Sequence, residues 1–395
     1  MEPWTWNQVD DGAVFFMQAG AAPVHSSSIF AFDLDDTIVT TKSGAKFATS
    51  GSDWQWLYAN TPDVLRALAA ATPPVKLAIM SNQKGVSDGK TALVIVQDRF
   101  EQVARALDIP LLCMFAVNDD LYRKPRINMW RLCVSAYNGG IVPDLHACVY
   151  VGDAAGRPAH RKTDGTLHKK DFSAGDARFA ANVGIRFTTP EEFFLKDASE
   201  NDFICLGPRV AELVIATGSG VLAGVPGVQE LVILIGPPAS GKSTLAADAT
   251  LFPPSAYTVI NQDTLKTKAK CLSAAAAALA AGRSIIVDAT NKDVETRRPW
   301  LELAAKARVP ARAVLIDASK ELCFHGNTFR ALNFATAPAD RRRVPSMVIH
   351  AWFKHFQAPT IAEGFASPVI IMPQYSHLRF ASREEAELFH SYLDA

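Results

Sequence analysis

Three aspartates, Asp33, Asp35 and Asp36, follow a short apolar run in the stretch SSSIFAFDLDDTIVT (26–40). At the end of a β-strand, residues i and i+2 point the same way, so Asp33 and Asp35 can face one phosphate group. One carboxylate could attack phosphorus and form an aspartyl-phosphate. The other could protonate the leaving oxygen and then activate water, which requires a raised pKa. Mg²⁺ would offset the repulsion between carboxylates and phosphate. An acid pair with this spacing could therefore serve phosphate transfer.

DLDDT matches the D-x-D-x-T signature of the haloacid dehalogenase superfamily, and further candidates follow it in order. Ser81 and Asn82 end the apolar run IMSN and could bind phosphate oxygens, Lys124 in LYRKP could supply a cation, and Asp153 in YVGDAAGRP could bind the metal. Each alone could be a cap, a surface lysine or a turn acid. Their order at successive strand ends favours one site, because open α/β sheets bind ligands at the carboxyl ends of their strands.

A second motif, GPPASGKST (236–244), fits G-x-x-x-x-G-K-[ST] between an apolar strand and a helix. Backbone N–H groups of such a loop face the nucleotide phosphates, its lysine reaches the β- and γ-phosphates, and its serine binds Mg²⁺. The predicted ATP-binding residues are Gly236, Ser240, Gly241, Lys242, Ser243 and Thr244 of this loop and Arg330, which lies in a later segment that could close over ATP. Mg²⁺ and ATP are therefore the expected cofactors.

The acceptor of the phosphate is expected near Asp263 in VINQDTL, whose carboxylate could take a proton from an alcohol. The alternative is that Asp263 or Thr264 only caps the following helix. Asp288 ends the strand SIIVD and resembles an acid that orients Mg²⁺. Arg330 and the triplet Arg341–Arg343 suit a lid over ATP, although a solvated helix would look similar.

The elements that must position these residues alternate between strand-like and helical patterns in both halves of the chain, which indicates parallel sheets covered by helices. The expected strands lie at 29–32, 75–82, 110–117, 147–153, 231–236, 257–261, 283–291 and 311–319. We predict two doubly wound α/β domains, a phosphatase-like domain over residues 1–205 and a P-loop kinase-like domain over 229–395. Residues 206–228, rich in glycine, are the predicted linker.

The bulk composition is that of a globular protein, with 395 residues of which 49% are hydrophobic and 20% charged. The 40 basic and 40 acidic residues balance, which argues against a protein that coats nucleic acid but allows local basic patches. The six scattered cysteines argue against a disulfide framework or a zinc site. No apolar run reaches the length of a membrane span, and the N-terminus is acidic where a leader peptide would be basic.

The motifs and the sequence around them, over about residues 25 to 375, resemble the eukaryotic polynucleotide kinase/3′-phosphatase family. The sequence segments that carry this resemblance are FDLDDT, SDWQWLY (52–58), SNQKG (81–85), LYRKP (121–125), VGDAAGRPA (151–159), KKDFSAGDARFAANVGI (169–185), TPEEFFL (189–195), the phosphate loop, NQDTL, DATN and FQAPTIAEGF (356–365). Members of the family remove 3′-phosphates from nucleic-acid ends and phosphorylate 5′-hydroxyls with ATP.

The resemblance implies a role for each matching residue. Asp33 would be the phosphatase nucleophile and Asp35 its acid and base, while Asp33, the Asp35 backbone carbonyl and Asp153 would bind Mg²⁺. Lys124 and Ser81 would hold the phosphate, and Asn82 is a further candidate. In the kinase half, Lys242 and Ser243 would bind ATP and Mg²⁺, and Asp263 would activate the 5′-hydroxyl. Arg157 and Arg297 are candidate nucleic-acid contacts.

Three departures from the family pattern carry expectations. The catalytic motif begins at residue 33, which leaves no room for the forkhead-associated domain of vertebrate members. Gln262 and Thr328 stand where arginines are usual, so we expect a 5′-kinase weaker than the 3′-phosphatase. Apart from these departures, the segments between the phosphatase motifs are too short for the cap domain of many haloacid dehalogenase superfamily members, which predicts an open cleft for a polymer end.

We therefore expect a bifunctional end-healing enzyme of DNA break repair, acting on single-stranded, nicked or gapped DNA as a nuclear monomer, with no membrane association. Mitochondrion and cytoplasm are alternative compartments. The alternative functions are RNA end healing, a 3′-phosphatase with a weak kinase, and a non-catalytic scaffold that binds ends. The complete acid set and phosphate loop argue against the scaffold.

Overall fold

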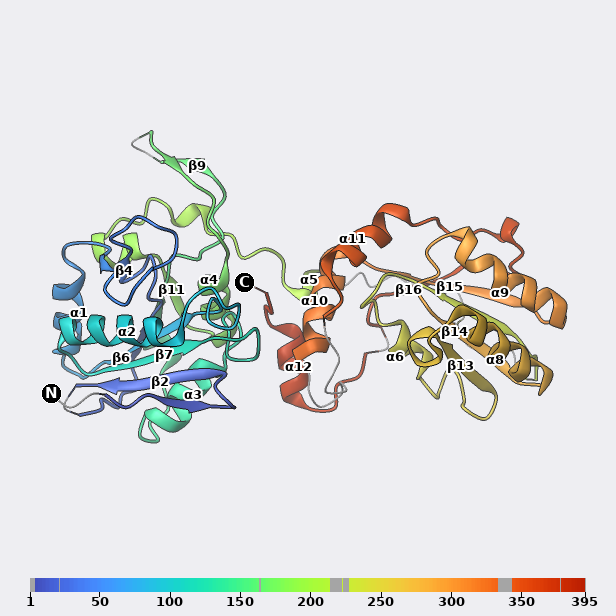
Figure 1. Ribbon diagram of the computed structural model, residues 1–395, viewed down its shortest axis with the longest axis horizontal. Helices are drawn as coiled ribbons and strands as arrows, with labels where there is room; N and C mark the ends of the chain where they lie inside the picture. The colour runs from blue at the N-terminus through green and yellow to red at the C-terminus, as the bar shows by residue number, and fades with distance from the viewer. Residues whose placement is uncertain are drawn as a thin grey trace. The chain divides into compact units, whose positions relative to one another are not determined.

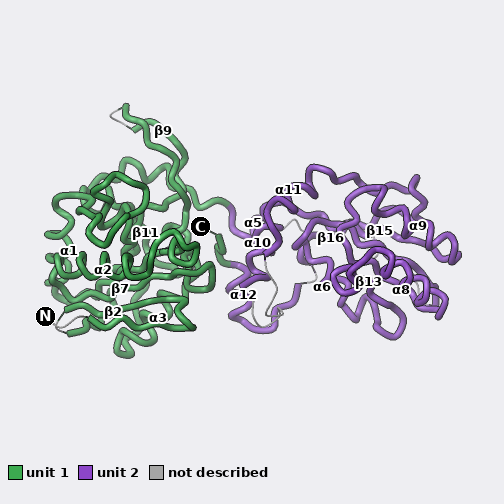
Figure 2. The backbone as a smooth tube through the Cα atoms, viewed as in Figure 1, with its two compact units in different colours: residues 1–207, 391–395 green, residues 208–390 purple. Residues whose placement is uncertain are grey.

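The computed structural model describes residues 4–20, 22–162, 165–213, 222, 227–332, 343–376 and 378–394. The chain forms two compact units, residues 1–207 with 391–395 and residues 208–390 (Figure 2). The end of the chain, which the sequence assigned to the second domain, packs on the first unit instead: Arg126 Nε donates to Leu393 O at 3.0 Å and Asn182 Nδ2 to Tyr392 O at 2.8 Å. Most of the predicted linker, 214–221 and 223–226, lies outside the described residues.

The first unit contains a seven-stranded sheet in the order β1-β2-β7-β6-β3-β8-β11 (Figure 1). The strands from β7 to β11 are parallel, as the sequence predicted, and β2 joins them antiparallel to β7. The bounds are β1 Asn7–Val9, β2 Val14–Ala19, β3 Ile29–Phe32, β6 Lys76–Asn82, β7 Leu111–Ala116, β8 Val149–Val151 and β11 Arg186–Thr188. The β1–β2 hairpin was not predicted.

Helices cover both faces of this sheet, so the doubly wound prediction is confirmed. Side chains alternate along β3: Phe32 packs into the core under α1 (Thr61–Ala69) and α2 (Leu93–Leu107), and Ala31 into the core under α3 (Asn128–Tyr137) and α4 (Gly175–Val183). Helix α2 buries residues at helical spacing, which is why one stripe of it faces the sheet. The apolar residues of this stripe are Val96, Phe100, Val103, Ala104 and Leu107.

Two small ladders extend from the first unit beside this sheet. One pairs β4 (Val39–Thr40) with β5 (Gln55–Trp56), and the other pairs β9 (His160–Arg161) with β10 (Leu167–His168). Each strand of these ladders has two residues. Hairpins of this size are marginal alone, so contacts to neighbouring segments must hold them in place.

The second unit contains a five-stranded parallel sheet in the order β13-β14-β12-β15-β16. Its strands are β12 Leu231–Ile235, β13 Tyr257–Asn261, β14 Ser284–Asp288, β15 Ala311–Asp317 and β16 Ile370–Pro373. Helices α8 (Lys268–Ala280) and α9 (Val294–Ala307) pack on one face, and α6 (Lys242–Ala246) on the other. The central strand β12 is apolar throughout because both of its faces are covered.

The remaining helices of this unit are α5 Val210–Leu213, α7 Gln262–Leu265, α10 Lys320–Leu332, α11 Ser346–His355 and α12 Arg383–His390. Within the part of the chain that the structure describes, no helix combines the length and the apolar character that crossing a membrane requires.

Candidate active sites

The carboxyl edge of the first sheet gathers the predicted phosphatase residues. Asp33 follows β3, Ser81 lies at the end of β6, and Asp153 follows β8. Lys124 comes from the segment after β7, and its ammonium lies 3.1 Å from Asp33 Oδ1 and 2.7 Å from Asp176 Oδ1. The lysine side chain is only 1% exposed, so its charge acts with little solvent screening.

Asp33, Asp153 and Asp176 each offer a carboxylate oxygen within 4.8 Å of the others. Burial, and then the charges of its neighbours Asp176 and Asp33, raise the pKa of Asp153 well above its usual value. Burial also raises the pKa of Asp176 to about 6, against the pull of Lys124. Clustered oxygen ligands that repel one another suit a hard divalent cation, which would relieve the repulsion. Thr37 orients Asp153, whose backbone N–H donates to Thr37 Oγ1 at 3.1 Å.

Asp35 lies outside that group of oxygens and is held separately. Arg99 reaches both of its carboxylate oxygens, at 2.9 and 3.0 Å, and Gln83 Nε2 donates to it at 2.7 Å. Burial raises the pKa of Asp35, Arg99 opposes that rise and Asp33 adds to it. Its side chain keeps 43% of its surface exposed, so solvent limits the rise. Contact of Asp35 with a metal would rest on its backbone carbonyl, as the family resemblance implied.

The two predicted phosphate ligands after β6 differ in their contacts. Ser81 is buried, and its hydroxyl accepts from Gln83 Nε2 at 3.0 Å. Asn82, expected to bind phosphate, uses its side chain differently: its Nδ2 donates to Lys124 O at 3.0 Å and its Oδ1 accepts from Lys124 N at 2.9 Å. Asn82 therefore positions the backbone that carries the lysine.

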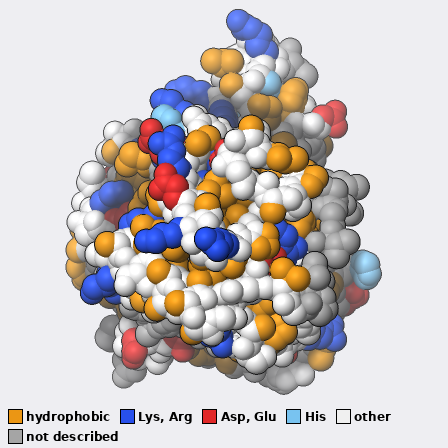
Figure 3. Space-filling model, turned by 90° about the vertical axis from the view of Figure 1, so that its right-hand side faces the viewer, with side chains coloured by type: hydrophobic (Ala, Val, Ile, Leu, Met, Phe, Trp, Pro, Cys, Tyr) orange, Lys and Arg blue, Asp and Glu red, His pale blue; other side chains and the backbone are white. Residues whose placement is uncertain are grey.

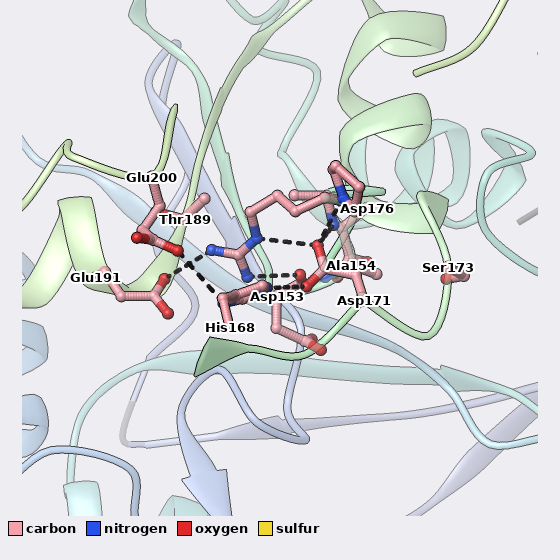
Figure 4. Close-up of polar contacts among 12 residues, drawn as sticks. Asp153, Ala154, His168, Asp171, Ser173, Asp176, Thr189, Glu191 and Glu200 are labelled. Atoms are coloured by element: carbon pink, nitrogen blue, oxygen red, sulfur yellow. Dashed lines mark hydrogen bonds and ion pairs between the residues drawn. The ribbon is translucent and has the colours of Figure 1, made fainter. Parts of the chain in front are cut away.

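Arg157, predicted to contact nucleic acid, is 2% exposed, and the prediction is wrong for this structure. Its Nε lies 2.9 Å from Asp171 Oδ2, its Nη1 3.5 Å from Glu191 Oε2, and its Nη2 donates to Asp153 O at 3.3 Å. Figure 4 shows the labelled carboxylates among which this network runs. The guanidinium braces the segment that carries Asp153.

In the second unit, the P-loop turns from β12 into α6 through Gly241, whose φ of +94° favours glycine. Lys242 Nζ donates to Pro237 O at 2.6 Å, and burial lowers the pKa of this lysine to about 8. Ser243 Oγ donates to Asp288 Oδ2 at 2.7 Å, and Asn261 Nδ2 donates to the same oxygen at 2.7 Å. A serine hydroxyl beside a strand-end carboxylate is the ligand pair that Mg²⁺ uses in P-loop enzymes.

The structure distinguishes the two interpretations of Asp263. Asn261 caps α7, because its Oδ1 accepts from the N–H groups of Asp263 and Thr264 at 2.7 and 3.4 Å. Neither of these two residues is the cap. The Asp263 carboxylate is exposed and forms no hydrogen bond or ion pair with any residue that the structure describes. It is available for an incoming hydroxyl.

Tyr375, which the sequence did not single out, anchors the P-loop. Its hydroxyl donates to Ala239 O, and the chain comes this close because position 326 is glycine: a Cβ there would lie 1.5 Å from the Tyr375 hydroxyl. Ser240, on the same loop, is buried, and Thr244 is exposed on α6.

The predicted lid is described only in part. Arg330 lies on α10, where its Nη2 donates to Asn327 Oδ1 at 3.2 Å. Thr328, one of the departures from the family pattern, is 3% exposed on the same helix. Arg341 and Arg342 lie outside the described residues.

The prediction that Arg297 contacts nucleic acid is also wrong, because its side chain is 0% exposed. It forms a bidentate pair with Glu363, with both distances at 2.8 Å, and donates to Asn291 O and Gln357 O. On the face shown in Figure 3, the Lys and Arg side chains are interspersed with hydrophobic and uncharged ones.

Comparisons with known proteins cover both units. Residues 28–194 match the family model described as polynucleotide kinase 3 phosphatase, and residues 231–359 match one described as an AAA domain. The chain is 34% identical to a bifunctional polynucleotide phosphatase/kinase of Schizosaccharomyces pombe over 87% of this chain and 79% of the relative. It is 30% identical to a putative bifunctional polynucleotide phosphatase/kinase of Acanthamoeba polyphaga mimivirus over 85% and 82% of the two chains. A polynucleotide 3′-phosphatase of Saccharomyces cerevisiae is 30% identical over 43% of this chain and 88% of its own.

Proposed function

Because the chain belongs to the bifunctional polynucleotide phosphatase/kinase family, we propose that its first unit removes 3′-phosphates and its second unit phosphorylates 5′-hydroxyls of nucleic-acid ends with ATP. The observation that carries the proposal is the buried ammonium of Lys124 between Asp33 and Asp176, at the sheet edge that presents Asp35. A scaffold that only binds ends would have no need of a buried carboxylate cluster, which destabilises the fold.

In the phosphatase reaction, an Asp33 oxygen attacks phosphorus, and the bond from phosphorus to the 3′-oxygen breaks. Asp35 gives its proton to that leaving oxygen, which the raised pKa of Asp35 favours. Asp35 then accepts a proton from the water that attacks the aspartyl-phosphate, releasing phosphate and restoring Asp33. Lys124 holds phosphate oxygens. Asp33, Asp153 and Asp176 fit Mg²⁺, which would neutralise charge between carboxylates and phosphate when bound.

In the kinase reaction, the P-loop backbone and Lys242 hold the ATP phosphates. Asp263 takes the proton of the 5′-hydroxyl as its oxygen attacks the γ-phosphorus, and the bond from that phosphorus to the β–γ bridging oxygen breaks to release ADP. Ser243 and Asp288 fit Mg²⁺, which would neutralise charge on the ATP phosphates when bound. Arg330 on α10 would add positive charge near the transferred group.

We further propose that the substrates are DNA ends that are single-stranded, nicked or gapped, handled by a nuclear monomer in break repair. Between β3 and α1, the described chain adds only the two-residue β4–β5 ladder and an isolated bridge between Asp35 and Val39, which supports a cleft open to a polymer. Ends of RNA are the alternative, because no residue named above distinguishes ribose from deoxyribose.

The test is to measure 3′-phosphate release and 5′ phosphorylation on DNA and RNA that are single-stranded, nicked or gapped. Asp33→Ala should abolish only the first activity and Lys242→Ala only the second. Similar efficiency on free 3′-mononucleotides and on oligomers would contradict the polymer substrate. A kinase turnover equal to or above that of the phosphatase would contradict the expected weak kinase.

A further inference from the structure

Two histidines and a glutamate meet at the base of the β9–β10 hairpin, outside the phosphatase cluster. His160 and His168 are cross-strand partners, and their rings stack with centroids 4.6 Å apart. Glu200, next to the short helical turn η3 (Asn201–Phe203), reaches both rings. The three side chains are 8%, 12% and 3% exposed, so this is a nearly closed polar cluster.

One carboxylate oxygen lies against both rings. Glu200 Oε2 is 2.8 Å from His160 Nε2 and 3.3 Å from His168 Nδ1, and the three side chains each offer a ligand atom within 4.8 Å of the others. Ligands that share a tetrahedral Zn²⁺ at about 2.0–2.2 Å are separated by roughly 3.3–3.6 Å. The 3.3 Å separation already fits, and the 2.8 Å separation would need to open by roughly half an ångström.

The remaining ring nitrogens already have acceptors. His160 Nδ1 lies 2.9 Å from Pro158 O, and His168 Nε2 lies 3.0 Å from Asp171 Oδ1. Figure 4 shows His168 with Glu200 and Asp171. All four ring nitrogens of the two stacked rings therefore face oxygen atoms. Histidines that bind a metal through one nitrogen and donate the other N–H to a carboxylate or carbonyl show this same arrangement.

We propose that His160, His168 and Glu200 bind a structural Zn²⁺, with His160 Nε2, His168 Nδ1 and Glu200 Oε2 as ligands and water in the fourth position. Imidazole and carboxylate ligands suit zinc. The cysteine pattern argued against a zinc site, but the ligands proposed here include no cysteine. His160 and His168 are cross-strand partners in β9–β10, and Glu200 lies 40 residues after His160. Lys162 Nζ, 3.9 Å from Glu200 Oε2, would turn toward solvent, since its side chain is 32% exposed.

The ion would fasten a hairpin that cannot be stable alone. Each strand of β9–β10 has two residues, and the proposed ligands join both strands to the segment before η3. Asp171 also bonds Arg157, which in turn donates to Asp153 O, so the ion would brace the phosphatase site from outside it. This role is that of a positioning element and not of a catalyst.

The test measures metal directly in the full-length protein. Wild type, purified and dialysed against Mg²⁺ buffer, should retain about one zinc ion per chain by elemental analysis. Loading with Co²⁺ should give the visible absorption of a four-coordinate N/O site. Removing zinc with a strong chelator should lower the melting temperature of the first unit, and adding Zn²⁺ should restore it.

Matched variants assign the ion to its ligands. His168→Asn and Glu200→Gln should lose the zinc, the Co²⁺ absorption and the chelator effect, while His146→Asn, at an exposed histidine of the same unit, should keep all three. Asp33→Asn should keep them as well, which separates this site from the phosphatase cluster. Zinc that is lost in Asp33→Asn and kept in His168→Asn would overturn the proposal. Wild type that neither retains zinc nor binds Co²⁺ would overturn it too, leaving a cluster held by protons alone.

Discussion

Arg297 gives the sharpest test of the second unit, because sequence and structure assign it opposite roles. The sequence predicts a nucleic-acid contact, whereas the structure buries the side chain completely against Glu363 and two backbone carbonyls. The informative change is Arg297→Met, which keeps much of the side-chain length and removes the charge. This variant should lose stability, and its affinity for polynucleotide should fall only through unfolding.

The size of the effect follows from the contacts. Glu363 is 7% exposed and receives two charged hydrogen bonds of 2.8 Å from Arg297. Removing one partner of a buried ion pair costs about 3–5 kcal/mol, because the other charge stays buried without compensation. In a unit of this size, each kcal/mol lost from the free energy of unfolding lowers the melting temperature by about 2–4 °C, so the expected fall in melting temperature is about 6–20 °C.

The assay is calorimetric unfolding with and without ATP. A ligand raises the unfolding temperature of the unit that binds it, so the transition that moves when ATP is added belongs to the second unit. Arg298→Met, at the exposed neighbouring arginine, is the control and should leave that transition unchanged. The double variant Arg297→Met with Glu363→Gln should lose less free energy of unfolding than the two single variants lose in sum. An unchanged transition together with a raised KM for the polynucleotide would refute the reasoning.

Three further predictions concern charged groups of the two sites. Arg99→Met removes the bidentate partner of Asp35 and should slow 3′-phosphate release by about 10–100-fold with 5′ phosphorylation unchanged; equal loss of both activities would contradict this. Because the pKa of Asp153 is raised, the folded state is penalised as the pH rises above the unfolded pKa, so Asp153→Asn should raise the melting temperature of the metal-free first unit at neutral pH. The same variant should lose the further rise with Mg²⁺, and a rise equal to that of wild type would count against Asp153 as a ligand. Burial lowers the pKa of Lys242 to about 8, so the unfolded chain binds the proton more tightly and the stability of the second unit should increase from about pH 8 to 10.5. Lys242→Met should abolish that increase, which thermal unfolding across the pH range would measure.

The sequence could predict the parallel strands and the residues at their ends because both depend on local pattern. Continuous apolar runs give buried parallel strands, and parallel strands bring their carboxyl ends to one edge. Asp33 and Lys124 meet for this reason, although they are far apart in the chain. The β1–β2 hairpin escaped prediction, because it adds antiparallel strands to an alternation that already seemed complete.

Residues whose role depends on distant partners could not be predicted. Arg99 lies within α2 among apolar positions, and its pairing with Asp35 requires the helix to pack over the end of β3. Asp176 lies in the segment 169–185 that resembles the family, but nothing in the neighbouring sequence showed that its carboxylate would reach Lys124. Arg157 and Arg297 looked like surface charges because their acids, Asp171 and Glu363, are 14 and 66 residues away. Local sequence records a charge and not its burial.

The return of the chain end to the first unit makes the second unit an insertion by topology. The segment that precedes it and the segment that follows it both belong to the first unit. Asn182 exchanges two hydrogen bonds with the Tyr392 backbone, and Arg126, 4% exposed, donates to Leu393 O. A chain cut after residue 207 would lose these hydrogen bonds together with the second unit. A clean separation of the activities requires excising residues 208–390 and joining the flanking segments with a short linker.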